Sequence, residues 1–219
     1  MSKPTIVFVD LSNVLFYSYY ASLKTKKSFK STVLDKLSRI NNAIVPDEMY
    51  LAKDCPRHTI WRNDHIDNYK GTRCNKGKKE IKEHFTSFYE SYNGPYKFLE
   101  LERTEADDII GIMVKKLHET HKLFVISADN DYLQLADMCE IYEVCYTGIK
   151  KKNVTASGKQ LLLEKIILGD TSDNIPKIMK NIGKKTINSL FETHGYDHVL
   201  SLAKNDESFE KNRLLIDMD

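Results

Sequence analysis

The sequence predicts an α/β fold with a mostly parallel central sheet that is flanked by helices. Short apolar runs alternate with amphipathic stretches over roughly the first 155 residues, as expected of strands joined by crossover helices. Beyond residue 155 only helical patterns remain. We therefore expect an α/β domain over residues 1–155 and a helical subdomain over residues 156–219.

Five strands are expected, each from an apolar run that ends at a polar or turn residue. The first, TIVFV, is apolar after its first residue, as a strand buried on both faces should be. Together the strands cover residues 5–9, 48–52, 96–101, 122–127 and 140–146.

Helices are expected between these strands and after them. Residues 104–120 have apolar side chains at helical spacing, and Thr104 precedes them as a candidate N-cap. Ser12 and Ser31 are candidate N-caps of two earlier helices. The remaining helices are expected at 12–24, 31–43, 79–91, 130–137, 158–169, 184–194, 196–204 and from 207 onward.

Residues 57–79 contain many charges, two glycines and little periodicity. Such a segment favours an exposed loop or a mobile helical segment. From residue 57 to residue 82 there are eight Lys or Arg and three acidic residues, and residues 177–185 contain four lysines and no acid. The net charge is only +2, so the sequence segregates its charges rather than carrying an excess.

The composition is that of an ordinary globular chain, with 219 residues, 41% of them hydrophobic and 29% charged. No apolar run reaches the ~18 residues of a membrane span. The four cysteines have no CxxC spacing, so we expect free thiols in a reducing compartment. The phosphate-binding patterns GxxxxGK[ST] and GxGxxG are absent, and no histidine pairs with a nucleophile as in a Ser-His-Asp triad.

Nine carboxylates occur in five clusters, three of which directly follow predicted strands. The carboxyl ends of parallel strands form one edge of a sheet, where open α/β sheets bind ligands. Two unit charges 4 Å apart interact by roughly 4 kcal/mol at an effective dielectric of 20, so convergence of these acids would require cations. A carboxylate-only site indicates Mg²⁺ or Mn²⁺ and phosphodiester chemistry. The candidate ligands are Asp10, Asp54, Glu105, Asp107, Asp108, Asp129, Asp131, Asp170 and Asp173.

Taken singly, most of these clusters have a simpler explanation. Acids in the first turn of a helix interact well with its dipole, as Glu105, Asp107 and Asp108 would. The sequences DND and GDTSDN are also common in turns and caps. Only the joint placement of the clusters at predicted strand ends favours a site.

Two basic segments are candidate nucleic-acid contacts, because Lys and Arg bind phosphates and aromatic rings can stack on unpaired bases. The alternative is a solvated charged face. The first segment offers Arg57, Arg62, Tyr69, Lys70 and Arg73. In the second, the start of a helix adds backbone N–H groups that suit a phosphate, and the candidates are Lys177, Lys180, Gly183, Lys184 and Lys185.

These motifs, in order along nearly the whole chain, resemble those of the flap endonuclease and 5′–3′ exonuclease superfamily, especially its phage RNase H-type members. VDLSNVLF and AKD resemble the first two acidic motifs, NYKGTR the YKxxR segment of the helical arch, and TEADDIIG the EADD helix. SADNDYLQL is similar to the [ST]xDxDxxQL motif. LGDTSDNIPKIMKNIGKKT is similar to the helix-three-turn-helix signature GDxSDNIPGVxGIGxKTA, and KNRLLIDMD to a later stretch in phage members.

The resemblance implies a PIN or Rossmann-like sheet, an arch or clamp segment over residues 57–92 and a helix-three-turn-helix subdomain. It implies a divalent-metal-dependent 5′ nuclease, acting as 5′–3′ exonuclease and flap endonuclease. Such enzymes hydrolyse phosphodiesters at 5′ ends and single-strand/duplex junctions of DNA or RNA–DNA, as in primer removal during replication. The implied partners are branched or 5′-ended nucleic acids and replication proteins. We expect a cytoplasmic monomer without membrane contact, and a phage origin is consistent with the motifs.

By the same resemblance, two Mg²⁺ ions, for which Mn²⁺ can substitute, would be held by two sets of acids. Asp10, Asp54, Glu105, Asp107 and Asp108 would hold the first ion. The second would be held by Asp129, Asp131 and Asp173, with Asp170 as a further candidate. Lys70 and Arg73 would contact the scissile phosphate, and residues 177–186 would grip duplex backbone, with K⁺ as a candidate ion there.

The sequence departs from the family pattern at two glycines, which are replaced by Lys177 and Asn181. A non-glycine residue tolerates positive φ poorly, but Asn tolerates it better than most, so Asn181 can still serve. The chain also ends soon after this motif, as a minimal family member or a shortened chain would.

Two alternative functions remain open at this point. A PIN-type endoribonuclease would have a similar acidic rim, although the helical signature after residue 165 argues against it. A catalytically inactive junction-binding protein would gain nothing from so many mutually repelling acids.

Overall fold

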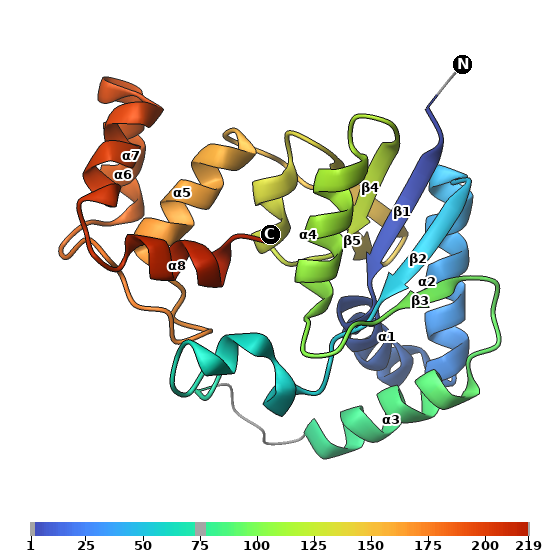
Figure 1. The fold of residues 1–219 in the computed structure, drawn as a ribbon. Coiled ribbons are helices and arrows are strands. Elements are labelled where there is room, and N and C mark those ends of the chain that lie inside the picture. The colour runs from blue at the N-terminus through green and yellow to red at the C-terminus, as the bar shows by residue number, and fades with distance from the viewer. Residues whose placement is uncertain (1–2, 73–77, 219) are drawn as a thin grey trace.

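The computed structural model describes residues 3–72 and 78–218, and a six-stranded sheet lies at its centre (Figure 1). The strand order is β3-β2-β1-β4-β5-β6, and only β5 and β6 pair as antiparallel neighbours. The mostly parallel sheet confirms the predicted fold class. The strands are β1 (Thr5–Asp10), β2 (Glu48–Ala52), β3 (Lys97–Leu99), β4 (Lys122–Ile126), β5 (Glu140–Cys145) and β6 (Gly148–Lys151).

The strand order creates a switch point beside β1. From β1 the chain builds β2 and β3 on one side and then returns to build β4 and β5 on the other. The crossover connections therefore leave in opposite directions, and a crevice opens at the carboxyl ends of β1 and β4.

Helices cover both faces of the sheet because its central strands are apolar on both sides. Val7 and Val9 of β1 pack in a cluster with α1 (Leu11–Thr25), α2 (Phe29–Ile44) and α3 (Lys78–Ser91). Ile6 and Phe8 face the other way, toward α4 (Ala106–Leu117) and the short 3-10 helix η3 (Asp131–Leu135). Figure 1 shows α1–α3 and α4 on opposite sides of the strands.

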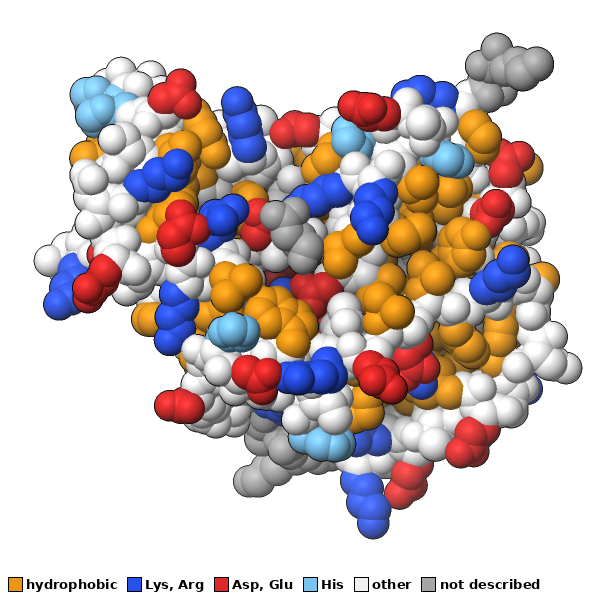
Figure 2. All heavy atoms as spheres, in the orientation of Figure 1, with side chains coloured by type: hydrophobic (Ala, Val, Ile, Leu, Met, Phe, Trp, Pro, Cys, Tyr) orange, Lys and Arg blue, Asp and Glu red, His pale blue; other side chains and the backbone are white. Residues whose placement is uncertain are grey.

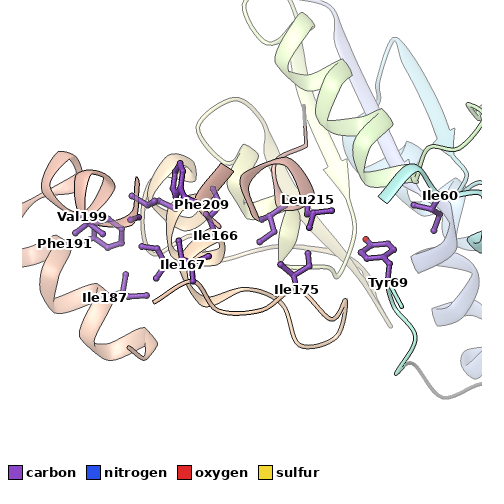
Figure 3. Packing of buried hydrophobic residues seen from close by; sticks show 14 of the residues in the cluster. Ile60, Tyr69, Ile166, Ile167, Ile175, Ile187, Phe191, Val199, Phe209 and Leu215 are labelled. Atoms are coloured by element: carbon purple, nitrogen blue, oxygen red, sulfur yellow. The ribbon is translucent and has the colours of Figure 1, made fainter. Parts of the chain in front are cut away.

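The C-terminal part consists of helices packed around a second apolar cluster (Figure 3). Ile167, Ile187 and Phe209 meet in this cluster, which extends to Ile60 and Tyr69 in the segment before α3. Segment 57–72 thus shares a core with the helices, and the predicted boundary after residue 155 stays a prediction. The helices are α5 (Gly158–Leu168), α6 (Lys184–His194), α7 (Tyr196–Lys204) and α8 (Phe209–Ile216).

The end of the described chain returns to the α/β sheet. Lys115 of α4 forms an ion pair with Asp217 at 2.6 Å. The Gln134 amide donates to the carbonyl of Ile216 at 3.3 Å and accepts from the N–H of Met218 at 3.2 Å. These contacts fix α8 next to α4 and η3. No helix in the described ranges is long and apolar enough to cross a membrane.

Two predicted N-caps are wrong by a few residues. Asp10, rather than Ser12, caps α1 by accepting from the N–H of Asn13 at 3.1 Å. Ser28, rather than Ser31, caps α2 by accepting from the N–H of Ser31. The helices begin at Leu11 and Phe29, slightly earlier than predicted, so each cap precedes the predicted candidate.

At α4, tertiary structure replaces the predicted local cap. The Thr104 hydroxyl donates to the carbonyl of Glu102, and the Asp54 carboxylate accepts from the N–H of Ala106 at 2.8 Å instead. Segment 57–72 contains two short 3-10 helices, η1 (Arg57–Thr59) and η2 (Trp61–Asp64). The hairpin strand β6 was not expected, because it is short and mostly polar.

Candidate acidic site at the carboxyl edge of the sheet

A cavity of about 1390 Å³ opens at the switch point of the sheet. Its walls come from the ends of β1, β2 and β4, the start of α4, segment 57–72 and α3. Figure 2 shows acidic and basic side chains intermixed over one face of the molecule, with a recessed acidic group near its middle. Seven of the nine predicted acids line the cavity, namely Asp10, Asp54, Glu105, Asp107, Asp129, Asp131 and Asp173.

Asp10 ends β1, Asp54 lies shortly after the end of the adjacent strand β2, and both are fixed by hydrogen bonds. Asp10 accepts from the Ser127 hydroxyl at 2.9 Å as well as capping α1. Asp54 accepts from the Ser12 hydroxyl at 2.5 Å and from the start of α4. Burial, followed by the nearby charge of Asp54, raises the pKa of Asp10 to about 7. The two carboxyl groups are therefore held close to each other in a partly buried position.

The start of α4 contributes Glu105 and Asp107. Glu105 is buried and accepts from Tyr69 at 2.9 Å, and it pairs with the ammonium of Lys70. Burial raises the pKa of Asp107 well above its usual range, and the charges of Glu105 and Asp108 add to this effect. Both carboxylates thus belong to a region of concentrated negative charge.

The second group of acids follows β4 and α5. Lys165 of α5 pairs with Asp131 and, at 2.9 Å, with Asp170. Burial, then Asp129, raises the pKa of Asp131, although Lys165 acts against them. For Asp170 burial is outweighed by Lys165 and by Ser172, which hold its pKa at about 2.

Lys70 connects the two groups of acids. Its backbone has a positive φ of 54°, and its ammonium reaches both Glu105 and, at 3.7 Å, Asp173. Tyr69 lies beside it and donates toward Asp173 at 3.2 Å. In this conformation the Lys70 ammonium is paired with carboxylates. The family resemblance implies that the same ammonium contacts the scissile phosphate.

Four predicted site residues differ in placement from the expectation. Asp108 and Asp170 do not line the cavity, because each is engaged behind it by a cation. Arg62 and Tyr69 are 2% and 6% exposed, and Tyr69 also lines the cavity. In the described conformation Arg62 binds Asp108 and Glu105, and Tyr69 binds Glu105 and Asp173, so direct contact of the two side chains with nucleic acid stays a prediction.

The remaining members of the first basic segment fall into two cases. Arg57 lies at the rim of the cavity and is partly exposed. Arg73 lies outside the described residues.

The second basic segment is on the surface before and at the start of α6. The side chains of Lys177, Lys180, Lys184 and Lys185 are exposed, and Gly183 precedes the helix as its N-cap. Asn181 has φ 63°, which confirms that it can take the backbone conformation expected of a glycine there. The Lys177 ammonium donates to the carbonyl of Ile182 at 2.9 Å and so folds back over this loop.

The donor chemistry of the cavity fits hard divalent cations. Carboxylate oxygens are the ligands that Mg²⁺ and Mn²⁺ prefer, and seven carboxyl side chains line the cavity. Within the described parts of the chain, no three His, Cys, Asp or Glu side chains form a group arranged to hold a metal ion. In this conformation the ammonium groups of Lys70 and Lys165 balance part of the acidic charge.

Several residues of the site were not predicted from the sequence. Lys165 lies in a predicted helix, and no local pattern indicates that it reaches Asp131, 34 positions earlier. Trp61 donates to Asp108 at 2.9 Å, and Ser127 orients Asp10. Their positions just before Arg62 and just after β4 are the only signals that could have identified them.

The sheet, its flanking helices and the carboxylate-lined cavity define a PIN-like α/β protein. The family model of the 5′–3′ exonuclease N-terminal resolvase-like domain matches residues 5–166. The chain therefore belongs to the 5′–3′ exonuclease family.

Curated relatives agree with this assignment. DNA polymerase I of Streptococcus pneumoniae R6 is 27% identical over 217 residues, which are 89% of this chain and 24% of the polymerase. A 5′–3′ exonuclease of Mycoplasmopsis pulmonis is 26% identical over 225 residues, covering 95% of this chain and 71% of that protein. The chain thus spans about a quarter of the polymerase relatives it matches.

Solved structures agree on the fold. The flap endonuclease of bacteriophage T5, crystallised with metal ions, has a TM-score of 0.77 at 20% identity, covering 98% of this chain and 89% of that one. A further structure of the same phage protein is a complex with DNA and metal ions.

Proposed function

We propose that this chain is a divalent-metal-dependent 5′ nuclease that cuts phosphodiesters at 5′ ends and at single-strand/duplex junctions. The observation that carries the proposal is the convergence of seven carboxylates on one cavity at the switch point of a 5′–3′ exonuclease-family sheet. A protein that only binds nucleic acid would gain nothing from such a cluster, because its charge repels phosphates.

In the proposed site, two Mg²⁺ or Mn²⁺ ions would be held by the acids that line the cavity. Asp10, Asp54, Glu105 and Asp107 form one group, and Asp129, Asp131 and Asp173 form the other. Such ions supply charge stabilisation for in-line displacement at phosphorus. Asp108 and Asp170 would act indirectly, by holding the side chains of Arg62 and Lys165, with which they form ion pairs.

The basic residues of the cavity would position the substrate. Lys70 would exchange its contact with Glu105 for the scissile phosphate and offset charge that develops there. Arg57 at the rim and Arg73 would contact the strand that enters. Arg62 and Tyr69 would hold the acids in place rather than touch nucleic acid.

The exposed lysines at the start of α6 would contact duplex backbone without reading sequence. Because Lys177 already donates to a carbonyl of this loop, we expect it to stabilise the loop as a K⁺ ion would in the family signature. Branched or 5′-ended DNA and RNA–DNA are the proposed substrates, and primer removal beside replication proteins is the proposed setting.

Cleavage of end-labelled substrates tests the proposal. We expect a 5′-flap duplex, a nicked duplex or an RNA–DNA hybrid to be cut in Mg²⁺ and to be bound intact in EDTA. Survival of all three in both Mg²⁺ and Mn²⁺ would leave the inactive junction-binding protein as the better explanation. Selective cutting of single-stranded RNA would support the endoribonuclease alternative.

Asp131→Asn tests the assignment of the cavity. We expect a loss of cleavage on the order of 100-fold or more, with duplex affinity retained in EDTA, since the change removes a proposed ligand but no phosphate contact. The matched control is Asp35→Asn on α2, an acid whose side chain is 42% exposed and pairs with Arg39 at 2.9 Å. Equal cleavage by both variants would remove Asp131 from the site.

A further inference from the structure

The hydroxyl of Tyr132 has an unusual position at the floor of the acidic cavity. Its ring is 1% exposed and packs in the apolar cluster with Phe8, Ile110 and Leu135. The residue also lines the cavity. Among buried side-chain oxygens and nitrogens in the described ranges, only the hydroxyls of Tyr132 and Ser18 have no hydrogen-bond partner.

A buried hydroxyl without a partner destabilises a folded protein, and the large majority of buried polar side-chain atoms do have one. Phenylalanine would fill the same space in this apolar cluster without that penalty. The Ser18 hydroxyl belongs to α1 and does not line the cavity, so the same reasoning does not connect it with the site.

The Tyr132 hydroxyl lies near several acids of the cavity. Asp10, Asp107, Asp54 and Asp129 all lie near enough for their charges to act on it. A phenol has one proton to donate, and an ionised carboxylate can only accept, so the hydroxyl can act as a neutral donor beside these acids. It lies out of hydrogen-bond reach of each of them in this conformation.

We propose that Tyr132 is a positioning residue whose hydroxyl donates to an oxygen acceptor that enters the cavity together with a divalent ion. The inference rests on the proposed function. The hydroxyl gains its partner only in the loaded site, so Tyr132 favours the loaded state over the free state. Its ring belongs to the core, and only its oxygen acts in the cavity.

Tyr132→Phe tests this inference, since it removes one oxygen and keeps the packing. In EDTA the variant should melt at the temperature of the wild type or higher, because no hydrogen bond is lost. In Mg²⁺ its melting temperature should rise less than that of the wild type. Its affinity for Mn²⁺, measured from the paramagnetic resonance of the free ion without DNA, should be lower by about three- to tenfold.

The matched control is Tyr196→Phe on α7, which does not line the cavity and should change neither response. Destabilisation of Tyr132→Phe in EDTA, or unchanged affinity for Mn²⁺, would overturn the inference. A defect seen only with DNA present would also overturn it, because the acceptor would then be a phosphate oxygen of the substrate. If the wild type itself neither binds Mn²⁺ nor cleaves, the proposed function fails.

Discussion

At the scale of single residues, buried ion pairs decide what the basic side chains of segment 57–72 do. The Arg62 guanidinium donates to Asp108 at 2.6 and 2.7 Å, to Glu105 at 3.1 Å and to the carbonyl of Leu215 at 2.8 Å. Removing such a charge from water costs several kcal/mol, so it persists only with partners of this quality. Sequence could not reveal these partners, because they lie 43, 46 and 153 positions away.

Arg62→Gln should lower the free energy of unfolding by about 3–5 kcal/mol, because Asp108 would stay buried without its counter-charge. Urea denaturation measures this loss. Adding Asp108→Asn should restore part of it, since the second charge is then removed as well. Arg57→Gln, in a partly exposed residue of the same segment, should stay within about 0.5 kcal/mol of the wild type. Similar losses for the two arginine variants would contradict the buried pairing.

At the scale of elements, the sequence predicted what periodicity and local chemistry control. The strand and helix patterns located β1, β2, β4, α1 and α4 to within a residue or two at most ends. The predicted cap of α4 was wrong because a distant side chain takes the place of a local one. The Asp54 carboxylate, rather than the Thr104 hydroxyl, accepts the hydrogen bond from the N–H of Ala106. The β6 hairpin was missed because pairing with β5, not its own composition, makes it a strand.

The loop before α6 allows a test of a local prediction. Asn181 has φ 63°, a conformation that costs a residue with a Cβ about 1–2 kcal/mol unless its side chain bonds locally. Asn181→Ala should therefore destabilise the chain by about 1 kcal/mol in urea, whereas Asn181→Gly should be close to neutral. Lys180→Ala, at the preceding exposed position, is the control and should also be close to neutral. Equal stability of the alanine and glycine variants at position 181 would show that this backbone is free to relax.

At the scale of the whole molecule, the site is assembled from segments that lie far apart in sequence. The position of acids directly after predicted strands indicated that these acids would converge, because parallel strands present their carboxyl ends at one edge of the sheet. Which acids face the cavity was not predictable, since Asp108 pairs with Arg62, 46 positions away, and Asp170 pairs with Lys165 of the preceding helix. Lys165 also pairs with Asp131 and so joins α5 to the segment that follows β4.

The packing of the chain end on α4 gives the most direct test of this assembly. A Cβ on Gly111 would lie 2.3 Å from the Met218 Cβ and 2.7 Å from the Met218 carbonyl oxygen. Alanine favours an isolated helix over glycine by about 1 kcal/mol, so the helix alone would gain from Gly111→Ala. The folded chain should instead lose about 1–3 kcal/mol, because residues 216–218 must move off α4.

Hydrogen exchange separates these two effects. In Gly111→Ala the amide of Met218, which is bonded to Gln134, should lose protection, while amides in the middle of β1 and β4 keep theirs. Lys116→Ala, an exposed position of the same helix, should leave both sets unchanged. If Gly111→Ala raised stability with full protection at Met218, the chain end would not be held against α4. Displacement of residues 216–218 should also loosen the contact of Arg62 with the carbonyl of Leu215 in α8. Because Arg62 pairs with Asp108 and Glu105, this change would extend to the acids at the cavity.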